Sequence, residues 1–96
     1  MREINKDLFE KMSLEDKTIY MIGFAAAFGP VDFYTKENKL ADLEFDPYIG
    51  EFIITVYEPN TKPYEDALKE EERYSGSDQG FLEYSLREMF DRLDFE

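Results

Sequence analysis

The clearest structural signal in the chain is the stretch EFIITVY, Glu51–Tyr57. β-Branched and aromatic residues dominate it, and these residue types favour a strand. Apolar side chains fall on both faces of that strand, so we expect it to lie centrally in a sheet, with other parts of the protein packed on each side. Asp46-Pro47 and Gly50 mark a turn before it, and Pro59 breaks the pattern after it.

A β-hairpin is expected immediately before this strand. The segments 31–35 and 40–45 flank a short polar stretch that has the composition of a hairpin loop. In the second arm apolar residues alternate with Asp42, Glu44 and Asp46. This period of two predicts a strand with one apolar face and one acidic face.

The N-terminal part combines a clear helix with an ambiguous segment. Residues 3–12 carry apolar side chains at helical spacing, which predicts a short amphipathic helix. Residues 18–28 are apolar on every side, so periodicity cannot decide between helix and strand. The alanines at 25–27 favour a helix capped by Ser13 and ending at Gly29. The β-branched and aromatic residues favour a buried strand, and we interpret the segment as a strand.

Two helices are expected in the C-terminal part. Thr61 can cap the first, which would run to about Tyr74. Residues 75–80 have the composition of a flexible connection, with Ser77 or Asp78 available as the next N-cap. The last helix would carry its apolar side chains on one stripe, formed by Leu82, Leu86, Met89, Phe90 and Leu93.

These elements predict an α+β domain with an N-terminal helix, a small antiparallel sheet of three to four strands and two C-terminal helices. Residues 1–96 are expected to form a single domain, because half of such a chain could not bury a useful core. The charged N-terminus does not resemble a secretory signal, and the longest apolar run is about half as long as a membrane-spanning helix. We therefore expect a cytoplasmic protein that does not bind membranes.

The residue types present exclude much of catalytic chemistry. The chain has no cysteine and no histidine, which rules out Ser-His-Asp and Cys-His catalysis and zinc sites built on either residue. Asp42, Glu44 and Asp46 have the spacing that opens a calcium loop, but Pro47 stands where that loop needs glycine. We expect no enzymatic activity, no metal and no cofactor.

Net charge gives the main indication of function. Acidic residues outnumber basic ones by 23 to 11, for a net charge of −12. Such a chain is poorly suited to bind nucleic acid directly and well suited to bind a basic protein. In size, charge and lack of catalytic residues, the chain resembles the small acidic inhibitors of phages and mobile elements, including anti-CRISPR and anti-restriction proteins. That resemblance implies inhibition of a nucleic-acid-binding enzyme by mimicry of DNA or RNA.

Candidate partner-binding residues are acidic side chains and tyrosines in or beside predicted turns. Carboxylates on alternate residues of a strand lie about 6 to 7 Å apart, which approximates the phosphate spacing of a nucleic-acid strand. Tyrosine combines a rigid ring with a hydrogen-bonding tip, as interfaces favour. The alternatives are an immunity protein that neutralises a basic toxin, and a structural subunit or homodimer. The candidates are Asp42, Glu44, Asp46, Tyr48, Tyr64, Glu70, Glu71, Glu72 and Tyr74.

Overall fold

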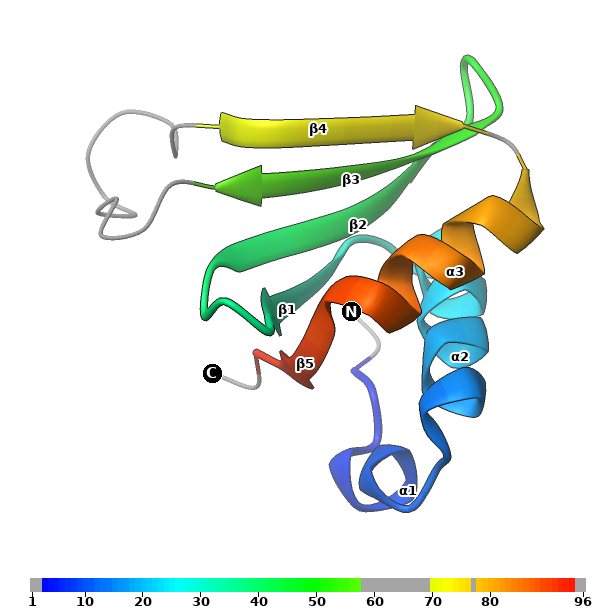
Figure 1. The fold of residues 1–96 in the computed structure, drawn as a ribbon. Helices are drawn as coiled ribbons and strands as arrows, with labels where there is room; N and C mark the ends of the chain where they lie inside the picture. The colour runs from blue at the N-terminus through cyan, green and yellow to red at the C-terminus, as the bar shows by residue number, and fades with distance from the viewer. Residues whose placement is uncertain (1–2, 58–69, 77, 95–96) are drawn as a thin grey trace.

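The computed structural model describes residues 3–57, 70–76 and 78–94 (Figure 1). The α+β class is confirmed, but the sheet has five strands rather than three or four. The elements in chain order are α1 (Lys6–Glu10), α2 (Leu14–Ala27), β1 (Val31–Thr35), β2 (Leu40–Asp46), β3 (Glu51–Tyr57), β4 (Glu70–Gly76), α3 (Gln79–Met89) and β5 (Phe90–Leu93).

The sheet is antiparallel, with the strand order β4-β3-β2-β1-β5. Strands β1 to β4 follow one another as neighbours. Helix α3 then brings the chain back so that β5 pairs with β1, on the far edge from β4 (Figure 1). Within the described ranges, no helix is long and apolar enough to span a membrane.

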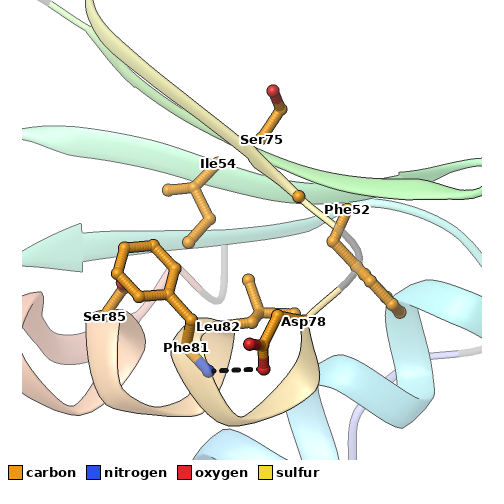
Figure 2. Close-up of a pocket in the computed structure, with 8 residues that line it drawn as sticks. Phe52, Ile54, Ser75, Asp78, Phe81, Leu82 and Ser85 are labelled. Carbon is orange, nitrogen blue, oxygen red and sulfur yellow. Dashed lines mark hydrogen bonds between the residues drawn. The ribbon is translucent and has the colours of Figure 1, made fainter.

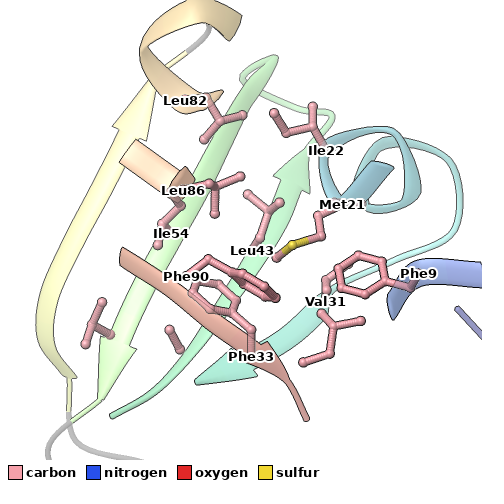
Figure 3. Packing of buried hydrophobic residues seen from close by; sticks show 14 residues of the cluster. Phe9, Met21, Ile22, Val31, Phe33, Leu43, Ile54, Leu82, Leu86 and Phe90 are labelled. Atoms are coloured by element: carbon pink, nitrogen blue, oxygen red, sulfur yellow. The ribbon is translucent and has the colours of Figure 1, made fainter. Parts of the chain in front are cut away.

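One face of the sheet, here called the inner face, forms the hydrophobic core with the helices (Figure 3). The two longer helices lie on the same side of the sheet, and α1 adds Phe9, whose ring packs edge-on against Phe90 with centroids 6.0 Å apart. The core residues are Phe9, Met21, Ile22, Ala25, Val31, Phe33, Ala41, Leu43, Ile54, Val56, Leu82, Leu86, Phe90 and Leu93.

The strand expected over residues 18–28 is wrong, because this segment belongs to α2. The Ser13 hydroxyl accepts a hydrogen bond from the Asp16 N–H at 3.1 Å and caps the helix, as the alternative interpretation required. Only one side of the helix faces the core, so Ile19 is left 42% exposed in spite of its apolar side chain. The buried positions, at helical spacing, are Thr18, Met21, Ile22 and Ala25.

The helix expected to run to about Tyr74 is wrong over its last residues, which form β4. Its expected start, with Thr61, lies outside the described residues. Ser75 and Gly76, expected in a flexible connection, are the last residues of β4. Pairing with β3 explains the difference, because β3 would otherwise expose a row of unpaired backbone groups.

The last helix begins as expected and ends earlier. The Asp78 carboxylate accepts a hydrogen bond from the Phe81 N–H at 3.2 Å and caps α3. The helix stops at Met89, and Phe90 adopts an extended conformation with φ −70° and ψ 130°. Residues Phe90–Leu93 then pair with β1 as β5, so the expectation that Phe90 and Leu93 continue the helical stripe is wrong.

The hairpin expected over residues 31–45 and the strand expected over residues 51–57 are both confirmed. β1 and β2 are joined by a loop in which Asn38 takes the left-handed conformation, with φ 62°, that asparagine tolerates well. β3 lies between β2 and β4 and is therefore an interior strand, although β2 is the middle strand of the five. Residues 53–56 of β3 are buried on both faces of the strand, as the run of apolar residues predicted.

Candidate functional site on the outer face of the sheet

The face of the sheet opposite the core gathers carboxylates from three neighbouring strands. Side chains alternate between faces along a strand, so residues that alternate with core positions lie on this outer face. On β2 the core positions are Ala41 and Leu43, and the acidic residues alternate with them. We call the resulting group the acidic face: Asp32 from β1, Asp42, Glu44 and Asp46 from β2, and Glu51 from β3.

Two pairs of like charges face each other directly across strands. The register places Asp32 opposite Asp42 and Asp46 opposite Glu51. Directly opposite side chains on one face have Cβ atoms about 4.5 to 5.5 Å apart, and like charges at that distance destabilise a sheet. The carboxylates expected from the alternation of β2 thus belong to a patch that extends across the neighbouring strands.

Two members of the acidic face also stabilise the fold. The Tyr57 hydroxyl donates a hydrogen bond to the Asp42 Oδ2 atom at 2.6 Å, a short distance typical of a carboxylate acceptor. The Asp46 Oδ1 atom accepts a hydrogen bond from the Tyr48 N–H at 2.9 Å and thereby fixes the turn between β2 and β3. Glu44 and Glu51 are both half-buried, and neither makes a hydrogen bond or ion pair with the described residues.

An arginine borders the acidic face at β5. The Arg92 guanidinium lies over the Tyr34 ring, 4.5 Å from its centroid. It donates hydrogen bonds to the Asn38 Oδ1 atom at 2.7 Å and to the Asp91 Oδ2 atom at 2.8 Å. These contacts hold the guanidinium at the hairpin loop, and neither acceptor belongs to the acidic face.

The structure brings together some of the other predicted residues and separates others. Tyr48 follows the β2 row in the turn after Asp46 and is 96% exposed. Glu70, Glu71, Glu72 and Tyr74 are in β4, so β3 separates them from the β2 row. Tyr64 lies outside the described residues.

Asp32 and Glu51 were missed as members of this site. Each stands directly across a hairpin from an aspartate that the alternation did identify. The signal was present in the loop lengths, because a loop of known length fixes which residues of the two arms lie opposite each other.

The chemistry available to this face is electrostatic and hydrogen-bonding. Within residues 3–57, 70–76 and 78–94, no group of three or more acidic side chains is arranged to hold a metal ion.

On α3, away from this face, the pKa of the Tyr84 hydroxyl is raised above its ordinary value of 10.0, because it donates a hydrogen bond to the Glu88 carboxylate and lies close to that negative charge. Tyr84 therefore stays neutral at physiological pH.

Comparison of the chain with known protein families, with curated proteins and with solved structures finds no match. The geometry of the chain itself is therefore the basis for the proposals below.

The bond between Tyr57 and Asp42 can be tested by stability. Replacing Tyr57 with Phe removes the hydroxyl from a partly buried carboxylate, so we expect the free energy of unfolding to fall by about 1 to 3 kcal/mol in urea titrations. Tyr34→Phe is the matched control, because that variant keeps the ring that Arg92 covers. Equal losses in the two variants would contradict a stabilising role for the bond.

Proposed function

We propose that this chain is a binding protein whose acidic face docks against the basic groove of a nucleic-acid-handling protein and blocks it by mimicking DNA or RNA. Carboxylates take the places of phosphates in this interaction. The proposed class is the anti-defence inhibitors of phages and mobile elements, of the anti-CRISPR or anti-restriction type. In this role the chain is an inhibitor and has no catalytic activity of its own.

The observation that carries this proposal is the pairing of like charges across strands. A sheet selected for stability alone would place opposite charges, or uncharged side chains, at Asp46 and at Glu51, which stand directly opposite each other. A cationic partner surface would relieve the repulsion between Asp46 and Glu51. Attraction to the cationic surface of a bound partner would then explain an arrangement that is unfavourable in the free protein.

Rows of charge on a rigid sheet also suit the geometry of a nucleic-acid mimic. Alternate residues of β2 hold their carboxylates about 6 to 7 Å apart, and neighbouring strands repeat the row about 5 Å away. Because these side chains stand on paired strands, little backbone conformational entropy is lost when they meet a groove lined by Lys and Arg. Complementary fields would speed association and make it depend on salt.

A second candidate function is supported by the turn beside the acidic face. Tyr48 and Ile49 are 96% and 58% exposed at the end of the β2 row. An exposed aromatic anchor next to carboxylates suits tight neutralisation of one basic toxin, as in an immunity protein. In this case the partner's nucleic-acid site need not be covered.

Competition with nucleic acid separates the two candidates. We expect the immobilised chain to capture a basic protein from nuclease-treated host lysate at low salt, and a duplex DNA or RNA added afterwards to release that protein in proportion to its concentration. Release by salt but not by nucleic acid would favour toxin neutralisation. Capture of no basic protein at any salt concentration would overturn both candidates.

A further inference from the structure

Among the residues that the structure describes, β4 is the end strand of the sheet on one side. It runs from Glu70 to Gly76 and pairs with β3 on one side. The strand order places it at the end of the sheet, and no other strand of the described residues pairs with its second side. An edge of this length presents a row of backbone N–H and C=O groups that can bind an added strand.

An apolar notch lies beside the C-terminal end of this edge, between β3, β4 and the first turns of α3 (Figure 2). Phe52 and Ile54 approach it from β3, and Phe81 and Leu82 approach it from α3. The cavity volume is about 30 Å³, enough for the tip of one aliphatic side chain. Phe81 is 61% exposed at its rim, although it is one of the largest apolar side chains of the helix.

Gly76 is the reason that the notch is open. The register places it opposite Phe52, which belongs to the inner face. A Cβ atom built on Gly76 would meet nothing within 4 Å, so the space that a side chain would fill at this position is empty. In edge strands such a gap can be covered by a side chain on a neighbouring strand.

The charge of β4 indicates what kind of strand would bind. Its sequence EEERYSG carries three glutamates and one arginine. A second copy of the chain on the same edge would also carry a net charge of −12, so the two copies would repel each other. A segment that carries Lys or Arg would be attracted instead.

We propose that the β4 edge binds an extended, basic segment of a partner protein by antiparallel strand addition. An aliphatic residue of that segment, opposite Gly76, enters the notch formed by Phe52, Ile54, Phe81 and Leu82. Lysine or arginine residues further along the segment pair with the glutamate-rich first half of β4. This surface is separate from the acidic face, so the proposal does not depend on the function proposed above.

The probe is a capped peptide that matches the seven residues of β4, with leucine at its first position, lysine at its fifth and seventh, and threonine elsewhere. Titrated into ¹⁵N,¹³C-labelled protein, it is expected to shift the amide signals of β4 and the methyl signals of Ile54 and Leu82. Replacing leucine by serine, or methylating alternate backbone nitrogens, is expected to weaken binding about 10-fold or more, because each change removes one of the two contacts. Equal binding by all three peptides would overturn the proposal.

Two matched protein variants test the notch. Phe81→Ala is expected to weaken binding of the leucine peptide about 10-fold, whereas Tyr84→Ala, which removes a similarly exposed aromatic side chain elsewhere on α3, is expected to change it less than about 2-fold. Gly76→Leu should fill the notch from within and weaken binding at least as much as Phe81→Ala, without loss of thermal stability. Equal effects of the Phe81 and Tyr84 variants, or unchanged binding by a folded Gly76→Leu variant, would contradict binding of the aliphatic residue in the notch.

The oligomeric state tests the other possible occupant of the edge. Sedimentation velocity should find a monomer. A dimer that the peptide dissociates would show that a second copy occupies the edge instead.

Discussion

Replacing Glu44 and Glu51 together with lysine is expected to weaken binding to the basic partner about 100-fold at low salt, because both charge-assisted contacts are lost and replaced by repulsion. These two positions are chosen because neither carboxylate makes a hydrogen bond or ion pair with the described residues. Isothermal titration calorimetry at about 50 mM and about 300 mM salt measures the effect, and the difference between wild type and variant should shrink at the higher concentration.

The control variant is Glu3→Lys with Glu10→Lys, which changes the net charge by the same amount outside the acidic face, on exposed residues in and before α1. We expect it to weaken binding less than about 3-fold, since only the long-range field changes. An equal loss of affinity in both variants would show that total charge matters and the acidic face does not.

Stability provides an independent readout for the same face. Glu51→Lys alone converts a repulsive cross-strand pair with Asp46 into an attractive one. The free energy of unfolding is therefore expected to rise by about 0.2 to 1 kcal/mol while binding weakens. A variant that lost both stability and binding would indicate a damaged fold and not a functional carboxylate.

The second large effect is expected from Met21→Asp, which should leave the protein unfolded at room temperature. Met21 is fully buried in the core, and an unpaired carboxylate there costs more than about 4 kcal/mol. Ile19→Asp is expected to cost less than about 1 kcal/mol, because Ile19 stands on the exposed side of α2. Circular dichroism during urea unfolding measures both.

This pair of variants distinguishes a helix from a strand at the same positions. In a strand, residues 19 and 21 would share one face, and the two substitutions would have similar effects. If Met21→Asp proved too damaging to purify, Met21→Ala at about 2 to 5 kcal/mol and Ile19→Ala at under about 1 kcal/mol would give the same contrast. Equal losses would contradict the packing of α2.

Local patterns predicted those parts of the fold in which one period is clear. The alternation of β2 and the dense β-branched run of β3 each point to one structure. The prediction that Ser77 or Asp78 caps the last helix is confirmed for Asp78. Residues 18–28 lack such a pattern, because apolar side chains occur on every side of the segment. The contact with the sheet determines which of them become buried, and that contact is not encoded within the segment itself.

The two strands that sequence reasoning missed, β4 and β5, are both edge strands. Glutamate-rich residues 70–72 favour a helix by propensity, and Phe90 and Leu93 continue the apolar spacing of α3. Pairing with β3 and with β1 overrides these preferences, since each pairing satisfies a row of backbone groups. Asp32 and Glu51 were missed because their place in the acidic face follows from strand register and not from their neighbours in the chain.

The return of β5 to the side of β1 has a consequence for biosynthesis. Phe90 and Leu93 belong to the core, yet they are made long after the strand they pair with. A nascent chain on the ribosome can form the early hairpin, but it cannot close its hydrophobic interior until residues 90–93 have left the exit tunnel. Contacts of such long sequence separation slow folding, and we expect a chaperone that recognises exposed apolar segments to hold this chain until β5 has left the exit tunnel.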